Sequence, residues 1–177
     1  MIFCAGDIES FEFATPIGIG LVDSAINLTR ICIMNPPEFI LFVGSAGSYG
    51  NHKVFDIVKS KSATNIENSF FNADSFTPVD NVVSTALDIS KDTMINSSNY
   101  ITRDLSLNKK YLDLNISLEN MEFFSIIKVA KAFNIPVGGI FIITNYCDSN
   151  AHQDFIKNHK EAMDKLSEYI KKGILHK

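Results

Sequence analysis

Short hydrogen-bonding side chains and small residues follow three apolar runs, at the places where strands are expected to end. They are Thr144-Asn145 after Gly138–Ile143, Gly44-Ser45-Ala46-Gly47 after Phe39–Val43, and Gly6-Asp7 after the first five residues. Glycine lets backbone N–H groups approach an anion or a sugar hydroxyl closely, and an amide is both donor and acceptor. Ligands of open α/β sheets bind at the carboxyl ends of strands. Each segment alone reads as an ordinary turn, but the three together favour a polar ligand.

A fourth candidate is Glu122, a carboxylate flanked by apolar residues near the start of a predicted helix. It can complement the positive end of the helix dipole. It can equally point into a cleft and accept hydrogen bonds from a diol. The sequence leaves both readings open.

The elements that must position these groups are predicted from apolar periodicity. Strands are expected at residues 1–5, 39–43, 53–60 and 138–143, with a shorter extended piece at 99–102. Helical periodicity covers Val22–Thr29 and stops at Asn35-Pro36-Pro37, and two further helices are predicted at Leu118–Ile135 and Asp154–Lys172. Residues 61–80 read as a long loop, and residues 82–90 as either strand or helix. Strands that alternate with helices, several of them apolar throughout, predict an α/β layered fold with a mostly parallel or mixed central sheet flanked by helices.

Composition narrows the class of protein. The 177 residues suffice for one domain with a core, so residues 1–177 are taken as a single domain. The net charge is −4 and Arg30 and Arg103 are the only arginines, which argues against nucleic-acid binding. Three scattered cysteines favour reduced thiols and a cytoplasmic location. No cysteine and histidine pair has the spacing of metal ligands, and His152 and His159 read as surface residues. Neither a signal peptide nor a membrane span is expected.

Taken in order, four segments resemble the nucleoside phosphorylase and nucleosidase family. That family includes purine nucleoside phosphorylases, uridine phosphorylase and methylthioadenosine/S-adenosylhomocysteine nucleosidase. The segments are "PIGIGLVDSA", "FILFVGSAGSYG" with "KVFDIV", "SSNYI", and "NMEFFSIIKVAKAFNIPVGGIFIITN", between residues 16 and 150. The resemblance implies a single-domain enzyme of this fold, closest to purine nucleoside phosphorylase, that cleaves the N-glycosidic bond of a 6-oxopurine (deoxy)ribonucleoside with phosphate.

The resemblance also implies roles for the first candidates. Asn145, with Thr144 before it, matches the position that assists the departing base, where adenine-cleaving members have aspartate. The similar "TN" ending of inosine- and guanosine-cleaving phosphorylases favours 6-oxopurine nucleosides, with inorganic phosphate as co-substrate and no other cofactor. Glu122 would bind the ribose 2′- and 3′-hydroxyls. A strand-capping role for Asn145 is the simpler alternative.

The remaining substrate contacts follow from the same matches, position by position. They are Met121 beneath the sugar, Tyr100 and Ile101 at the base, Ser45 with the backbone of Gly44 and Ala46 at phosphate or ribose, and Gly18 and Gly20 near the sugar or phosphate.

Several departures keep other functions open. The chain is shorter than usual members in its early part, Phe55 replaces a usual glycine, and Phe42 stands where hexameric phosphorylases have a phosphate-binding arginine. A hydrolytic nucleosidase is the alternative, with Glu9 as the base that activates water, although Glu9 reads more simply as an exposed loop charge. A member that binds nucleosides without cleaving them is the third reading.

The resemblance implies small-molecule partners, a purine nucleoside and phosphate, and a homo-oligomer whose subunits complete one another's pockets. The Phe70-Phe71 pair is a candidate for that interface. Neither nucleic acid nor membrane is an expected partner.

Overall fold

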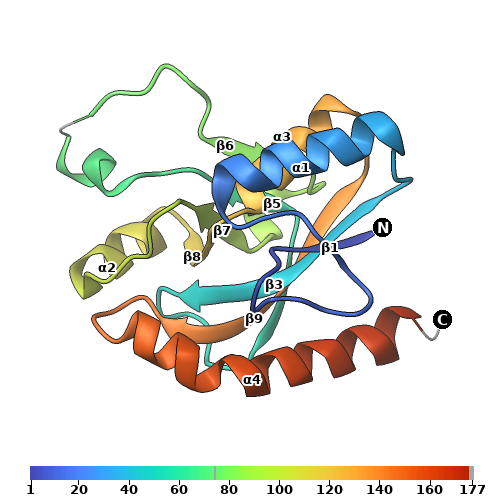
Figure 1. The fold of residues 1–177 in the computed structure, drawn as a ribbon. Helices are drawn as coiled ribbons and strands as arrows, with labels where there is room; N and C mark the ends of the chain where they lie inside the picture. The colour runs from blue at the N-terminus through green and yellow to red at the C-terminus, as the bar shows by residue number, and fades with distance from the viewer. Residues whose placement is uncertain (74, 176–177) are drawn as a thin grey trace.

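A mixed β-sheet lies at the centre of the computed structural model, which describes residues 1–73 and 75–175 (Figure 1). Over these residues the sheet has nine strands. The strands are β1 (Ile2–Cys4), β2 (Thr15–Pro16), β3 (Ile40–Ser48), β4 (Ile57–Ser60), β5 (Ser62–Thr64), β6 (Val82–Ser84), β7 (Met94–Ser97), β8 (Ile116–Asn120) and β9 (Val137–Tyr146). The helices are α1 (Gly20–Met34), α2 (Leu105–Asp113), α3 (Phe123–Ala132) and α4 (Ala151–Ile170), with short 3₁₀ turns at Asn68–Asn72 and Ile89–Lys91 and a π turn at Lys171–Leu175.

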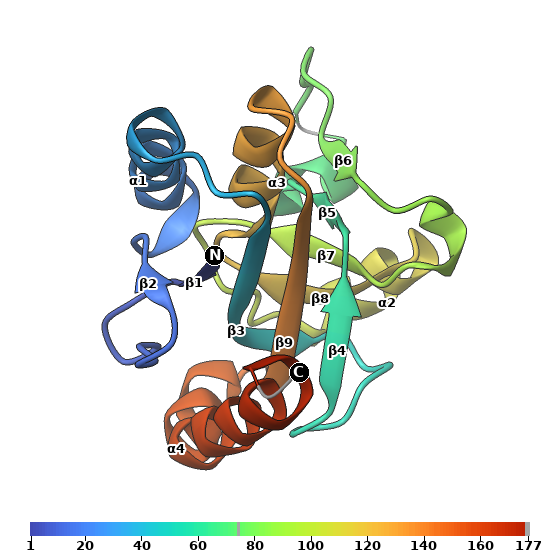
Figure 2. The same ribbon diagram turned by 90° about the vertical axis from the view of Figure 1, so that its right-hand side faces the viewer.

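Strand β3 is the hub of the sheet. It runs parallel to β1 and to β9, and its last residues pair antiparallel with β8. Figures 1 and 2 show α1 and α3 on one face of β3 and β9 and α4 on the other. Both faces are therefore covered, which explains why these two strands are apolar almost throughout.

Two apolar clusters hold the layers together. Phe42 lies in the cluster under α1 and α3, where its ring is 5.8 Å from that of Phe141 and 6.4 Å from that of Phe123, measured between centroids. The cluster under α4 contains Val43 and Leu166 from opposite layers. Since β3 supplies residues to both clusters, its carboxyl end is held rigidly.

The α/β fold class is confirmed, but one predicted helix is wrong in its first part. Leu118–Asn120 belongs to strand β8, and α3 begins only at Phe123. Residues 116–118 alternate buried, half-buried and buried, and the strand pairs with β7 and β3. Met121 therefore lies in the turn between strand and helix, so the helical face predicted to include it does not form.

Other boundaries also differ from the prediction. Asn99–Thr102 is not a strand, and the neighbouring strand is Met94–Ser97. The 53–60 strand is limited to Ile57–Ser60 because Phe55 adopts the left-handed region, with φ of 72°. The predicted loop at 61–80 contains β5, and helix α4 begins at Ala151 rather than at Asp154. None of the described helices is both long and apolar enough to cross a membrane.

Candidate active site

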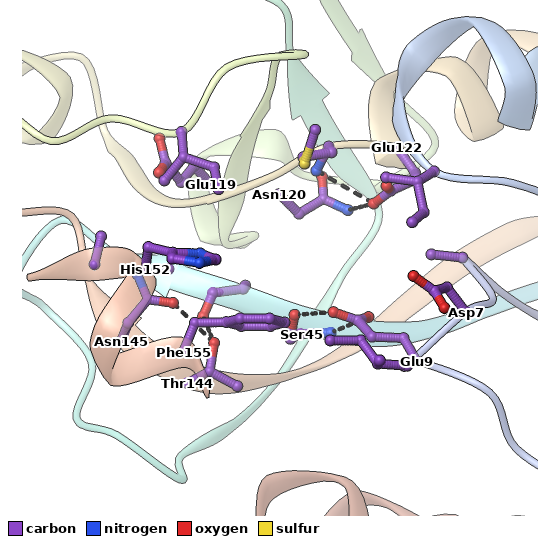
Figure 3. A pocket seen from close by; sticks show the side chains of 18 of the residues that line it. Asp7, Glu9, Ser45, Glu119, Asn120, Glu122, Thr144, Asn145, His152 and Phe155 are labelled. Atoms are coloured by element: carbon purple, nitrogen blue, oxygen red, sulfur yellow. Dashed lines mark hydrogen bonds between the residues drawn. The ribbon is translucent and has the colours of Figure 1, made fainter. Parts of the chain in front are cut away.

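A cavity of about 250 Å³ opens at the carboxyl ends of β1, β3 and β9 (Figure 3). The turn after β8, the loop around Tyr100 and the first turns of α4 complete its walls. The volume is on the scale of one small-molecule ligand. The cavity therefore lies where the strand ends of the sheet predicted a polar ligand.

Most of the predicted site residues line this one cavity. Those that do are Glu9, Ser45, Ala46, Tyr100, Ile101, Met121, Glu122, Thr144 and Asn145. Three predicted glycines do not line it: Gly44, Gly18 and Gly20. Gly20 instead donates its backbone N–H to Glu122, and Gly18 turns the chain before α1 with φ of +98°. Their direct contact with a sugar or a phosphate is not supported.

Glu9 is held at the end of β3 and is not an exposed loop charge. The Ser45 N–H donates to Glu9 Oε2 at 3.0 Å, and the Ser45 hydroxyl donates to Glu9 Oε1. A tight turn directs Glu9 there, since Gly6 has φ of +101° and exchanges two backbone hydrogen bonds with Glu9. Gly44 lets the carboxylate approach closely, because a Cβ at that position would lie 3.0 Å from Glu9 Oε2.

Glu122 is buried at another wall of the cavity, where it accepts three N–H hydrogen bonds. Its Oε1 accepts from Gly20 N at 2.9 Å, and its Oε2 from Asn120 Nδ2 at 3.1 Å and Met121 N at 3.2 Å. Burial raises the pKa of Glu122 to about 8, the Gly20 N–H opposes that rise, and the nearby charge of Glu9 adds to it. The free site therefore keeps Glu122 largely protonated at neutral pH.

A β-bulge presents Thr144 and Asn145 at the end of β9. Ala46 pairs with Ile143 but Gly47 pairs with Asn145, so Thr144 is the extra residue. Bulges of this kind occur next to active sites, where they redirect side chains. Here the bulge turns two consecutive polar residues to the same cavity.

The amide of Asn145 has a fixed orientation. Its Nδ2 donates to the Tyr146 carbonyl at 3.0 Å, and its Oδ1 accepts from the Thr144 hydroxyl at 2.9 Å. The opposite orientation would place Oδ1 against a carbonyl oxygen, which is repulsive. One amide N–H and one acceptor lone pair remain for a ligand.

Sequence reasoning missed Glu119, a buried carboxyl group in the wall beside Asn145. Its Oε2 accepts from the Tyr49 hydroxyl at 2.9 Å and its Oε1 from Thr102 N at 3.0 Å. Burial raises the pKa of Glu119, and these two hydrogen bonds oppose the rise. Through Thr102 it anchors the loop that contains Tyr100 and Ile101.

Three more polar or aromatic lining residues were not expected there, namely Asn120, His152 and Phe155. Asp7 also lines the cavity, and it follows one of the strand ends at which a ligand was predicted. His152 and Phe155 come from successive turns of α4, so His152 is not merely a surface residue. Figure 3 shows Asp7, Glu9 and Glu122 at one end of the cavity and Asn145, Glu119 and His152 at the other. The i, i+3 spacing places His152 and Phe155 on one helix face, but no local pattern indicates that this face meets the cavity.

The charge of the cavity is predominantly acidic. Four carboxyl groups line it, and no lysine or arginine does so within the described chain. The Arg103 guanidinium donates to the Ser149 carbonyl at 3.3 Å instead. Phe42, at the position of the arginine in hexameric phosphorylases, is fully buried in the core. Among the described residues, no group of three or more His, Cys, Asp or Glu side chains is arranged to hold a metal ion.

Comparisons with known proteins give a family and a set of similar structures. The sequence matches the family profile described as the phosphorylase superfamily over residues 3–174. A search of curated protein sequences gave no match.

Among solved structures, a Helicobacter pylori 5′-methylthioadenosine/S-adenosylhomocysteine nucleosidase mutant with 5′-methylthioadenosine in its active site aligns with a TM-score of 0.78. Its identity is 17%, over 93% of this chain and 80% of that one. A futalosine hydrolase mutant from Helicobacter pylori strain 26695 aligns with a TM-score of 0.76 and 18% identity, over 89% and 77% of the two chains. A candidate 5′-methylthioadenosine/S-adenosylhomocysteine nucleosidase from Francisella philomiragia aligns with a TM-score of 0.77 and 16% identity. The alignment covers 97% of this chain and 96% of that one. At these identities the likeness shows the fold, and the Francisella protein has a similarly short chain.

Proposed function

Because this chain belongs to the phosphorylase superfamily, whose members cleave nucleosides, we propose that it hydrolyses the N-glycosidic bond of purine nucleosides. Water is the nucleophile, and Glu9 accepts its proton. This is the hydrolytic alternative of the sequence analysis, and it replaces the phosphorylase as the favoured reading. Similar structures that are named as nucleosidases and as a futalosine hydrolase also support it.

The hydrogen-bonded pair of Glu9 and Ser45 carries the proposal. Ser45 was expected to face phosphate or the ribose, but its N–H and its hydroxyl both donate to the Glu9 carboxylate. A phosphate at the same place would face that negative charge. Two like unit charges 4 Å apart repel by about 4 kcal/mol at an effective dielectric of about 20. No lining lysine or arginine within the described chain offsets this repulsion.

The same acidic cavity suits the hydrolytic transition state. As the C1′–N9 bond breaks, positive charge develops on the sugar, and carboxylates beside it stabilise that charge more than they stabilise the neutral substrate. Glu122 binds the ribose diol, and the water oxygen bonds to C1′ while its proton passes to Glu9. The bonding electron pair leaves with the purine, whose edge is held by the free N–H and lone pair of Asn145.

An assay of base release tests the proposal. Inosine, guanosine, adenosine and 5′-methylthioadenosine are incubated with the enzyme in phosphate-free buffer and again with phosphate. We expect release of at least one purine base without phosphate and no stimulation by phosphate. Glu9→Gln should lower kcat by roughly 10²–10⁴-fold because its amide cannot accept the water proton. Glu12→Gln is the matched control, since Glu12 is an exposed carboxylate outside the cavity lining.

Two other outcomes would contradict hydrolysis. Release that requires phosphate would restore the phosphorylase reading. Nucleoside binding in calorimetry with no release under either condition would support the non-catalytic reading, in which Asn145 only holds the base.

We further propose a homo-oligomer in which the apolar rim of the cavity is covered. Ile8, Ile19, Tyr100 and Ile101 line the cavity and remain exposed in the single chain. Of the predicted interface pair, only Phe70 is exposed, because Phe71 packs edge-on against Tyr111 at 4.7 Å between ring centroids. Sedimentation equilibrium should give a dimer or larger assembly. A monomer at all concentrations would contradict it.

A further inference from the structure

The proposed hydrolysis does not yet account for the proton that the departing purine must receive. A purine that departs with the electrons of the C1′–N9 bond is a poor leaving group unless a ring nitrogen is protonated. Asn145 is at the position that is aspartate in adenine-cleaving relatives, but an amide donates a hydrogen bond and does not transfer its proton. The fixed contacts of Asn145 with Thr144 and Tyr146 do not change this chemistry.

Only a few lining groups can exchange a proton, and they are distributed unevenly. Three carboxyl groups gather at the end away from Asn145 in Figure 3, where the sugar is proposed to bind. Glu119 is close to Asn145, since a Cβ on Gly47 would lie 3.0 Å from Asn145 Nδ2 and 3.4 Å from Glu119 Cγ. However, the Tyr49 hydroxyl and the Thr102 N–H engage both oxygens of Glu119, so neither oxygen is free to approach the base.

Tyr100 also lines the cavity, but a phenol is a much weaker acid than an imidazolium, so His152 is the remaining group suited to this role. Figure 3 shows its imidazole extending into the cavity at the end that holds Glu119 and Asn145. Histidine is the side chain best suited to proton transfer near neutral pH. Its exposed position at the rim lets the imidazole take up a new proton from solvent after each cycle.

Helix α4 is anchored to the end of β9, which fixes where His152 lies. The Asn158 amide donates to the Thr144 carbonyl at 2.8 Å, and Ala151 is buried in the cavity wall. Phe155, one turn after His152, lines the same cavity. The first two turns of α4 therefore present an imidazole and an aromatic ring to the place where the base is proposed to bind.

Resting on the proposed hydrolysis, we propose that His152 is the general acid of this enzyme. The C1′–N9 bond breaks and its electron pair moves into the purine, while the imidazolium N–H of His152 transfers its proton to N7. The water oxygen bonds to C1′, keeps one hydrogen as the new hydroxyl and passes its other proton to Glu9. One water is consumed and no other reactant is needed, since Glu9 later releases to solvent the proton that His152 regains.

A comparison of two leaving groups tests this role. Inosine needs protonation of its base, whereas p-nitrophenyl β-D-riboside releases a nitrophenolate that leaves without a proton. We expect His152→Gln to lower kcat for inosine by roughly 10²–10³-fold and to change kcat for the nitrophenyl riboside by less than about threefold. His52→Gln, a histidine outside the cavity, should change neither, and Glu9→Gln should lower both. The melting temperature and circular dichroism of each variant are measured beside the kinetics.

Each result decides the assignment. Equal losses on both substrates, or no loss on inosine, in folded His152→Gln would overturn the general-acid role while hydrolysis by the wild type and its loss in Glu9→Gln still stand. A wild-type protein that cleaves neither substrate would overturn the proposed function and this assignment with it. Loss on inosine alone would establish His152 as the proton donor.

Discussion

If the chain binds nucleosides as proposed, the raised pKa of Glu122 makes that binding depend on pH. Folded and without ligand, this carboxyl group titrates at about 8, so below that value it is mainly neutral. Its three N–H partners and two ribose hydroxyls are all donors, and only the carboxylate accepts from all of them. Nucleoside should therefore bind the ionised form and become tighter as the pH rises.

The size of the effect follows from the pKa. If only ionised Glu122 binds, the apparent Kd is multiplied by one plus ten to the power of pKa minus pH. For a pKa of about 8, the apparent Kd should fall roughly 90-fold between about pH 6 and about pH 9. Binding should release close to one proton per nucleoside at the acid end of this range.

Isothermal titration calorimetry with a purine C-nucleoside measures both quantities, because its carbon–carbon glycosidic bond is not cleaved. The analogue is chosen so that it does not itself ionise in this range, and buffers of different ionisation enthalpy report the proton. Glu122→Gln should bind more weakly and lose this pH dependence. A wild-type affinity that is flat with pH, or a slope that persists in Glu122→Gln, would refute the reasoning.

Three further predictions concern stability and the support of the site. The pKa of Glu122 is raised above its unfolded value of about 4.5, so the stability that this group contributes is present below about pH 4.5 and lost as pH rises to about 8. The loss is at most about 5 kcal/mol, and Glu122→Gln should remove it. Urea titrations at several pH values measure the difference. Gly20→Ala should lower the free energy of unfolding by about 1–2 kcal/mol, since φ is +83° and the added Cβ would lie 2.8 Å from Asn99 Oδ1. Gly173→Ala is the control and should leave the melting temperature unchanged, because the added Cβ would have no atom within 4 Å. Tyr49→Phe removes a donor from buried Glu119 and should destabilise the protein by about 1–3 kcal/mol, with unchanged urea stability as the contradicting result.

Much of the fold could be predicted because the layers impose clear periodicities. The buried strands β3 and β9 are continuous apolar runs, and α1 and α4 carry one-sided apolar patterns. Strand β8 was missed because it runs into α3 without an intervening glycine or proline. Asn120 was the available signal, since its Oδ1 accepts the N–H of Phe123 at 3.2 Å, as short polar side chains do at helix starts.

The sequence predicted the site residues that belong to motifs found in a set order along the chain. Glu122 and Asn145 line one cavity, as the motif order predicted, and their roles in binding remain predictions. Glu9 and His152 could not be placed by local pattern, because their positions depend on contacts distant in sequence. Glu9 is positioned by the hydrogen bond from Ser45, and His152 by the hydrogen bond from Asn158 to the Thr144 carbonyl, which fixes α4.

The origin of the oxygen atom that joins the sugar is the most direct test of hydrolysis. The protein is incubated with a purine nucleoside in ¹⁸O-labelled water with inorganic phosphate present, and mass spectrometry identifies the sugar product. The account predicts free ribose that carries one ¹⁸O at C1. Unlabelled ribose 1-phosphate would contradict it.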